Sequence, residues 1–128
     1  MSGRPRSVRD SMRTVIIDGD NVLRALEVRR PPAVEEFLQR LEMAAAEKDW
    51  EVAVIFDGPP RYLPRETGFL TVQYSLGKPA DSLIERKVYQ APDRMNVVVV
   101  THDRAESDLV RGLGALVWNA QRLKEEME

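Results

Sequence analysis

The chain has 128 residues, of which 43% are hydrophobic and 31% are charged, and its formal net charge is −2. This size and composition are typical of one globular domain with its own core. The chain has no cysteine, which excludes disulfides, thiolate metal ligands and a cysteine nucleophile, and its single histidine, His102, excludes the usual zinc sites. No apolar run is long enough to span a membrane and no secretory signal pattern opens the chain, so we expect a cytoplasmic protein without membrane association.

The first residues differ in composition from the rest of the chain. Residues 1–12 combine several arginines with a glycine and a proline, which predicts a flexible basic arm. Such an arm either keeps the protein in solution or contacts phosphates. We expect residues 13–128 to form a single domain, since no linker or internal repeat divides them.

Apolar, β-branched runs alternate with segments of helical periodicity along this domain. In chain order we predict a strand over 14–18, helices over 21–30 and 31–48, strands over 51–57 and 69–75, a helix over 79–90, a strand over 97–101, a helix over 103–111, a strand over 115–118 and a helix over 120–128. Strands joined through helices pair in parallel. The pattern therefore predicts an α/β fold, a three-layer α/β/α sandwich around a mostly parallel sheet of about five strands.

Four aspartates stand where this sheet would bring them together. Asp18, Asp57 and Asp103 end or directly follow predicted strands, and Asp81 begins a helix shortly after another strand. The carboxyl ends of parallel strands line one edge of a sheet, where ligands bind. Crowded carboxylates repel each other unless a cation neutralises them, and a hard ion such as Mg²⁺ or Mn²⁺ prefers oxygen ligands. The sequence therefore predicts a metal-dependent active site at this edge.

Other residues could support the site. Glu85 follows Asp81 by one helical turn, so the two carboxylates share a helix face and could share an ion. Asn21 could orient a metal ligand or the scissile phosphate, and Thr101 offers a hydroxyl donor at a strand end. We expect His102 to be a supporting residue rather than a general base.

Each of these residues also has a purely structural explanation. Aspartates before glycines form turns after strands, and an acid in the first turn of a helix favours the helix dipole. Asp103 with Glu106 three residues later resembles a helix cap, and Asn21 could cap the helix that begins near it. Glu85 could be a solvated surface residue. The convergence of four aspartates at one predicted edge favours the metal site over independent structural roles.

Four segments, in order, resemble the NYN domain, and most closely its YacP-like ribonuclease branch within the PIN-like nuclease superfamily. These segments are residues 15–22, 56–58, 72–85 and 99–106, each with one of the four aspartates. The match extends from about residue 14 to the C-terminus. The resemblance implies a PIN-like fold and a metal-dependent endoribonuclease that uses Mg²⁺ or Mn²⁺. It implies the catalytic and metal-binding positions Asp18, Asp57, Asp81 and Asp103, with Asn21 and Glu106 in supporting positions.

The resemblance has departures that concern the choice of substrate more than the metal site. Asp20 stands where this branch often has an aromatic residue, and His102 stands where a small hydroxyl is usual. The chain is also shorter than typical members, mostly in the loop after the second aspartate. Residues on loops near the edge could hold RNA through phosphate contacts and base stacking. These candidates are Arg61, Tyr62, Arg65 and Lys78. The RNA could be free or presented by a ribosome or another RNA–protein assembly.

Other functions fit parts of the sequence. A non-catalytic RNA-binding adaptor of the same fold would need no turnover, although four intact aspartates favour an enzyme. Asp18 and Asp20 also fit the start of a haloacid-dehalogenase-type phosphatase. In that family a hydroxyl residue precedes the lysine, whereas here Lys78 precedes Thr101. A receiver-type signalling domain would want a lysine after the next strand, where this chain has Trp118.

Overall fold

The computed structural model describes residues 12–128, so the predicted basic arm lies, apart from Met12, outside the described residues. Five strands form one sheet: β1 (Arg13–Asp18), β2 (Trp50–Phe56), β3 (Leu70–Tyr74), β4 (Val97–Val100) and β5 (Leu116–Trp118). Their order in the sheet is β3-β2-β1-β4-β5, and every neighbouring pair is parallel. The predicted α/β fold is confirmed.

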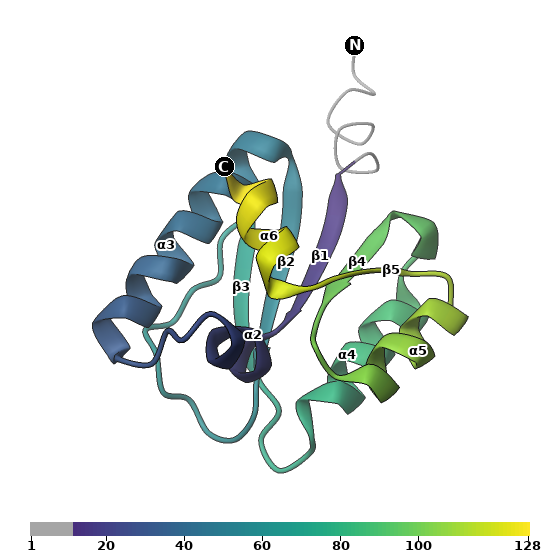
Figure 1. The fold of residues 1–128 in the computed structure, drawn as a ribbon, viewed down its shortest axis with the longest axis horizontal. Coiled ribbons are helices and arrows are strands. Elements are labelled where there is room, and N and C mark those ends of the chain that lie inside the picture. The colour runs from purple at the N-terminus through teal and green to yellow at the C-terminus, as the bar shows by residue number, and fades with distance from the viewer. Residues whose placement is uncertain (1–11) are drawn as a thin grey trace.

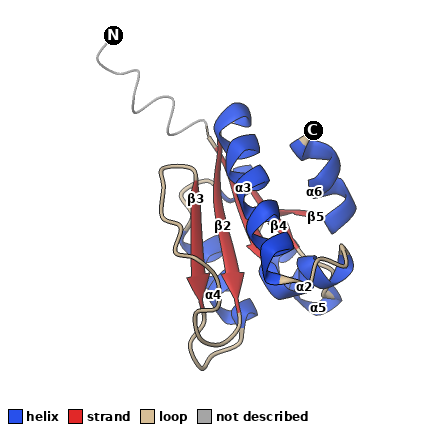
Figure 2. Ribbon diagram, turned by 90° about the vertical axis from the view of Figure 1, so that its left-hand side faces the viewer, coloured by secondary structure: helices blue, strands red, loops and turns tan. Residues whose placement is uncertain are grey.

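Helices cover both faces of the sheet, as Figures 1 and 2 show. They are α2 (Gly19–Ala25), α3 (Pro31–Lys48), α4 (Ala80–Gln90), α5 (Arg104–Gly112), α6 (Ala120–Met127) and a single 3₁₀ turn, η1 (Arg94–Asn96). Side chains of α2, α3 and α6 share one core with the sheet, and those of α4 and α5 share the other. None of the helices within residues 12–128 is long and apolar enough to cross a membrane.

The strands are apolar on both sides because both faces of a parallel sheet are buried. Successive residues of a strand point to opposite faces. In β1, Val15 and Ile17 therefore pack towards α3 and α6, while Ile16 between them packs towards α4 and α5. All four valines of β4 are buried in the same way. This two-sided burial explains why the strands appear in the sequence as continuous apolar runs.

The order of the strands reverses between β1 and β4. The chain leaves β1 through α2 and α3 on one face of the sheet, and it reaches β4 through α4 on the other face. Open α/β sheets bind ligands in the crevice that such a reversal leaves at the carboxyl ends of the strands. Figure 2 shows the strands β2 and β3 pointing to the end of the sheet at which α2 and α5 lie. Asp18 ends β1 and Thr101 follows β4, so both lie at this crevice.

One predicted element differs clearly from the structure. The helix predicted over 21–30 is α2, which begins earlier, at Gly19, and ends at Ala25. It can begin there because Gly19 is packed against the ring of Phe56, where a Cβ atom would lie only 2.6 Å from a ring carbon. Beyond the helix, Glu27 has a φ of 59° and turns the chain towards α3. The other predicted strands and helices match the observed bounds to within one residue, and η1 was not predicted.

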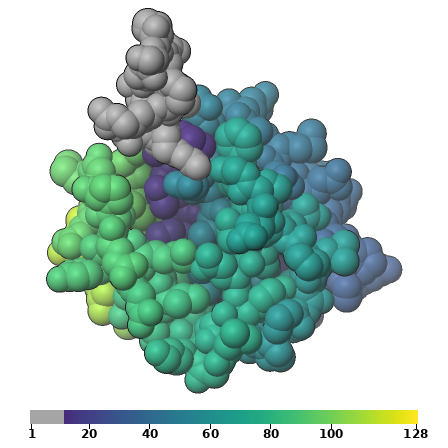
Figure 3. All heavy atoms as spheres, turned by 180° about the vertical axis from the view of Figure 1, so that it is seen from behind, coloured from purple at the N-terminus to yellow at the C-terminus, as the bar shows by residue number. Residues whose placement is uncertain are grey.

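The helices leave part of one sheet face open. Figure 3 shows purple atoms of β1 at the base of a hollow between the green and teal parts of the chain. Thr14, Ala53, Thr71 and Gln73 from three neighbouring strands line this hollow, together with Lys87 of α4. It lies on the face of the sheet and contains none of the candidate site residues, so it is separate from the crevice.

Candidate active site at the carboxyl edge of the sheet

Asp18 and Glu106 share one hydroxyl group in the crevice. Oγ1 of Thr101, a residue that is 2% exposed, lies 3.2 Å from Oδ2 of Asp18 and 3.2 Å from Oε1 of Glu106. A hydroxyl has one proton, so it donates to only one of the two carboxyls at a time. Oε2 of Glu106 is buried and has no hydrogen-bond partner among residues 12–128. The described residues therefore offer too few hydrogen-bond donors for the carboxyl oxygens of this pair.

Burial raises the pKa of both carboxyls. The pKa of Asp18 is raised mainly by burial and further by the charges of Asp57 and Asp20, although its hydrogen bonds oppose the shift. Burial, followed by the charge of Asp18 and the hydrogen bond to it, raises the pKa of Glu106 to about 8, and the charge of Asp81 adds to this. Without a cation, Glu106 is therefore mostly protonated at neutral pH. The same shifts place the carboxylates of Asp20, Asp57 and Asp81 within electrostatic reach of the pair.

The ends of β1 and β2 are joined through Asp20 and Asp57. The backbone N–H of Asp57 donates to Oδ2 of Asp20 at 2.8 Å, and Oδ1 of Asp57 accepts from the N–H of Ala80 at the start of α4, also at 2.8 Å. Gly58 follows with a φ of 79°, which lets the chain turn away sharply after the strand. From the sequence, Asp20 is a departure from the family pattern and the general acid of the phosphatase alternative, and the structure places it in the crevice through these contacts.

Arg61 balances part of the negative charge at this point. Its Nη2 lies 3.1 and 3.2 Å from the two carboxylate oxygens of Asp20 and donates to the carbonyl oxygen of Asp57 at 2.8 Å. Tyr62, the next residue, packs its ring against Phe56 with 4.9 Å between the ring centroids, and the Arg61 guanidinium lies 5.4 Å from the Tyr62 ring. The structure therefore brings two of the predicted RNA contacts to the edge of the crevice.

Asp81 and Lys78 approach from the start of α4. Asp81 lies half-buried in the first turn of the helix, where its charge acts on Glu106. Glu85 lies one turn further along and is also half-buried. The ammonium group of Lys78 is exposed and has no ion-pair partner among residues 12–128. Helix α4 thus carries two half-buried carboxylates in its first turns, of which Asp81 acts on the crevice, and Lys78 lies just before the helix.

Asp103 and Asn21 have defined local partners. Oδ1 of Asp103 accepts from the backbone N–H of Glu106 at 2.8 Å and so caps α5, as the structural explanation of this pair predicts. Asn21 does not cap α2, since Asp18 holds the N-cap position. Instead, Oδ1 of Asn21 accepts from the N–H of His102 at 2.7 Å, and Nε2 of His102 accepts from the N–H of Ala120 at 3.0 Å. These contacts tie the loop after β4 to α2 and α6.

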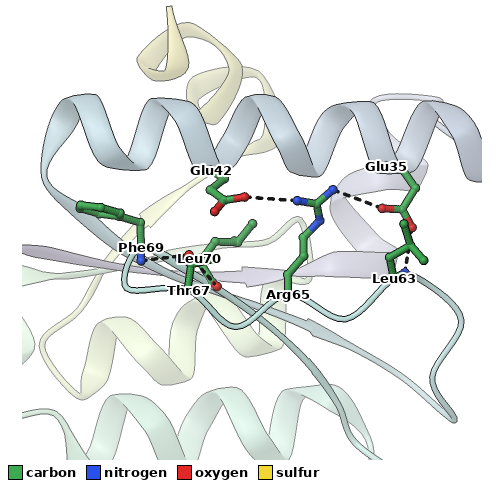
Figure 4. A network of polar contacts seen from close by, with 7 residues as sticks. All are labelled: Glu35, Glu42, Leu63, Arg65, Thr67, Phe69 and Leu70. Atoms are coloured by element: carbon green, nitrogen blue, oxygen red, sulfur yellow. Dashed lines mark hydrogen bonds and ion pairs between the residues drawn. The ribbon is translucent and has the colours of Figure 1, made fainter.

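Arg65 is directed to α3 rather than to the crevice, as Figure 4 shows. Its Nη1 lies 3.2 Å from Glu42 and its Nη2 lies 3.3 Å from Glu35. Only 18% of its side chain is exposed. Of the four residues predicted to hold RNA, Arg65 is the one whose charged group is already engaged with two carboxylates of a neighbouring helix.

The donor groups suit a hard divalent cation. Within residues 12–128, no three histidine or acidic side chains are arranged as a preformed metal cluster, and Asp57 and Asp103 accept hydrogen bonds from backbone amides instead. The potential ligands are nevertheless all carboxylate oxygens, which Mg²⁺ and Mn²⁺ prefer. The unsatisfied Oε2 of Glu106 and the raised pKa values are features that a bound cation would relieve. The residues present therefore fit such an ion.

Comparisons with known proteins find the same fold in solved structures and place this chain in a sequence family. The sequence profile of the YacP-like NYN domain matches residues 15–128. Two crystal structures of Rae1 (YacP) from Bacillus subtilis, one of them of a mutant, share the fold with TM-scores of 0.75 and 0.70. Each is 22% identical to this sequence, and the alignment covers 91% of this chain and 74% or 75% of the Rae1 chain. Among curated protein sequences, none matches this chain significantly.

Proposed function

Because the chain belongs to the YacP-like NYN domain family, which is nuclease-like, we propose that it is a metal-dependent endoribonuclease that hydrolyses phosphodiester bonds in RNA. The observation that carries this proposal is the pair of half-buried Asp18 and buried Glu106 around Thr101, at the point where the strand order reverses. Three further carboxylates act on this pair electrostatically. RNA, either free or within a ribosome or another RNA–protein assembly, is the proposed partner, and the cytoplasm is the proposed location.

The proposed cofactor is Mg²⁺ or Mn²⁺, in keeping with a nuclease family that generally uses divalent metals. When bound, the ion would activate a water molecule and offset the charge on the scissile phosphate. Because Oε2 of Glu106 has no hydrogen-bond partner among the described residues, Glu106 could bind the ion directly beside the predicted ligands. The residues proposed to hold the ion are Asp18, Asp57, Asp81 and Asp103, with Glu85 as a further candidate and Glu106 next to Asp18.

The neighbouring residues would position the site and the substrate. Thr101 directs the carboxylate of Asp18, and Asn21 holds the loop after β4 in place. Arg61 is 40% exposed, so it can contact a phosphate while it remains bound to Asp20. Lys78 has no ion-pair partner among residues 12–128 and could contact a phosphate, and Tyr62 offers an aromatic ring on which an unpaired base could stack.

The proposal is tested by incubating the purified protein with mixed single-stranded RNA and Mn²⁺, with and without a chelator. We expect internal cleavage that the chelator stops. Asp18→Asn should abolish cleavage while leaving the free energy of unfolding unchanged or higher, because it removes a carboxylate whose charge is disfavoured by burial and by neighbouring carboxylates. An Asp18→Asn variant that cuts as well as the wild type would disprove the assignment. RNA binding without cleavage in Mn²⁺ would instead indicate a non-catalytic adaptor.

Asp20→Asn is the matched control for this experiment. Asp20 is bound to Arg61 and to the backbone of Asp57, and an asparagine can keep the hydrogen bonds that its oxygen accepts. A nuclease should therefore lose much less activity in this variant than in Asp18→Asn. A phosphatase that used Asp20 as its general acid would lose turnover equally in both variants and would act on small phosphomonoesters.

A further inference from the structure

Two clefts have lining residues near the carboxylates, and the proposed metal site does not assign either cleft a role. The first, the α2 cleft, has a volume of about 430 Å³ and is lined by Asp20, Leu23, Arg24, Val28, Arg29 and Tyr62. The second, the α5 cleft, has a volume of about 480 Å³, and its lining includes Thr101, His102, Arg104, Ser107, Arg111 and Asn119.

Each cleft shares at least one lining residue with the candidate active site. The α2 cleft contains Asp20, whose charge acts on Asp18. The α5 cleft contains Thr101, whose hydroxyl lies 3.2 Å from Asp18. Between the clefts stands the first turn of α2, where Asp20 faces the loop after β2 and Asn21 binds the loop after β4. Asp20 of this turn lines the α2 cleft, and Asn21 of the same turn binds His102, which lines the α5 cleft.

The α2 cleft is suited to a phosphate and a base. Arg24 and Arg29 are exposed, and neither has an ion-pair partner among the described residues. The one carboxylate of the cleft, Asp20, is already paired with Arg61. The cleft is thus locally positive although the protein carries a net negative charge. Tyr62 supplies an aromatic ring in the wall, and bases of single strands stack on such rings whatever their identity.

The α5 cleft is suited to phosphates alone. Arg104 is exposed and, within residues 12–128, has no ion-pair partner. Among the described residues, Arg111 reaches only Asp108, a carboxylate that also lines this cleft, at 4.0 Å. Both side chains are more than half exposed, so water and salt weaken this pair. No phenylalanine, tyrosine or tryptophan lines this cleft, and its one ring is the imidazole of His102, whose Nε2 accepts from the N–H of Ala120. The cleft offers two guanidinium groups and the carboxylate of Asp108.

We propose that a single strand of RNA crosses the active site from the α2 cleft to the α5 cleft. Arg24 and Arg29 would hold phosphates on one side of the scissile bond, and Arg104 and Arg111 would hold phosphates on the other. A base stacks on Tyr62 on the first side only. Because the strand continues past the site in both directions, an internal phosphate is the substrate and no free end is required. This inference rests on the proposed function and deepens it by assigning the path of the RNA.

The path is tested by measuring the affinity of a labelled single-stranded RNA by fluorescence anisotropy across a range of salt concentrations, in EDTA so that no cleavage occurs. The variants are Arg24→Ala with Arg29→Ala, and Arg104→Ala with Arg111→Ala. Each pair should weaken binding and flatten the slope of log affinity against log salt by about 1.4, since each lost phosphate contact contributes about 0.7 for single strands. The corresponding glutamine variants keep the aliphatic stems and should give the same change.

A control pair removes two arginines outside both clefts. Arg40 lies on α3 in an exposed pair with Glu36, and Arg86 is exposed on α4. Changing both to alanine alters the net charge equally and should leave the slope unchanged. A wild-type slope in either cleft variant, or the same flattening in the control pair, would overturn the proposed path.

Circular single-stranded RNA separates this inference from the proposed function. With Mn²⁺, the wild-type protein should cut a circle as readily as a linear RNA of the same sequence. Cleavage of the linear RNA without cleavage of the circle would overturn the two-sided path and the endonucleolytic part of the proposed function, and would leave only a metal-dependent ribonuclease. If neither RNA is cut, the nuclease proposal fails, while the anisotropy slopes still support or overturn the path by themselves.

Discussion

Glu106 shows how a residue with an ordinary sequence context acquires an unusual environment. It lies in the first turn of α5, where an acid usually faces solvent near the positive end of the helix. The sequence pair of Asp103 and Glu106 predicts a helix cap, and this cap is formed by Asp103. Glu106 is 4% exposed, and its carboxyl group shares the Thr101 hydroxyl with that of Asp18. No local pattern indicates this, because the pairing of β1 with β4 brings the two carboxyls together.

This environment predicts how stability depends on pH. The pKa of Glu106 is about 8 in the folded protein and about 4.3 in an unfolded chain. Between these values the folded state holds a proton that the unfolded state has released. The stability that this proton contributes is complete below about pH 4.3 and is lost as the pH rises through about 8. The raised pKa of Asp18 acts in the same direction. In EDTA, the wild type should therefore lose stability between about pH 5 and 8.

Urea unfolding in EDTA at several pH values measures this effect as a difference between variants. Glu106→Gln removes the titrating group, so the wild type should lose stability relative to this variant as the pH rises. Glu36→Gln changes an exposed glutamate on α3 and should keep the pH dependence of the wild type. Parallel curves for the wild type and Glu106→Gln would show that the pKa of Glu106 is not raised.

Among the elements, the connection between β2 and β3 is the one that has no helix. These parallel neighbours are joined by residues 57–69, which carry Arg61 and Tyr62 to the crevice. Contacts with α3 hold the connection in place: Arg65 pairs with Glu35 and Glu42, and the N–H of Leu63 donates to Glu35 at 2.9 Å (Figure 4). Arg61 and Tyr62 thus lie on a loop that is held in place by contacts of Leu63 and Arg65 with α3.

Arg65→Ala should consequently affect stability more than RNA binding. The substitution leaves Glu35 and Glu42 without their partly buried partner, and we expect a loss of about 1–3 kcal/mol in the free energy of unfolding. Arg40→Ala breaks an exposed pair and should cost less than about 0.5 kcal/mol. Urea unfolding and RNA anisotropy on both variants check this. If Arg65→Ala keeps its stability but loses RNA affinity, Arg65 is a phosphate contact, as its position in the sequence first suggested.

Most elements could be predicted from the sequence because their signals are local. Apolar runs mark strands that are buried on both faces, and prolines 31 and 32 mark the first turn of α3. The start of α2 could not be predicted in this way, since it depends on contact between Gly19 and Phe56 of another strand. The partners of Arg65 depend likewise on how a loop folds over a helix. Glu35 and Glu42 are two helical turns apart, which predicts a shared helix face but not the arginine that binds them.

The same distinction holds for the candidate site. Asp18, Asp57, Asp81 and Asp103 were singled out because each belongs to a strand end or to the helix that follows. In the structure, the charge of Asp57 acts on Asp18, and the charges of Asp18 and Asp81 act on Glu106. Asp103 instead caps α5. Asp20 and Glu106 complete the crevice through contacts between distant segments. Strand-end position therefore predicts which edge is acidic, and tertiary packing decides which carboxyls face each other.

For the whole molecule, the crevice concentrates negative charge in a protein whose net charge is only −2. The repulsion between these carboxylates opposes folding unless protons or a cation offset it. Proton and metal ion should therefore be interchangeable as stabilising partners of the folded state. A ligand that binds only the folded protein stabilises it by about 2.7 kcal/mol at a concentration a hundred times its Kd.

We accordingly expect Mn²⁺ to raise the melting temperature of the wild type, and to raise it more at about pH 8 than at about pH 6. At the higher pH the ion meets carboxylates that have lost their proton, so less proton release accompanies binding. Differential scanning fluorimetry in Mn²⁺ and in EDTA at both pH values measures the two shifts. Mg²⁺ should give the same order of effects.

Two variants make this measurement specific to the crevice. Asp18→Asn removes the central carboxylate and should show almost no shift with Mn²⁺, whereas Asp108→Asn removes an exposed acid on α5 and should shift as the wild type does. Both variants lose one negative charge, so nonspecific screening affects them equally. Equal shifts in the two variants would place the ion elsewhere on the surface. A wild-type shift that is larger at about pH 6 than at about pH 8 would mean that the ion does not replace the proton shared by Asp18 and Glu106.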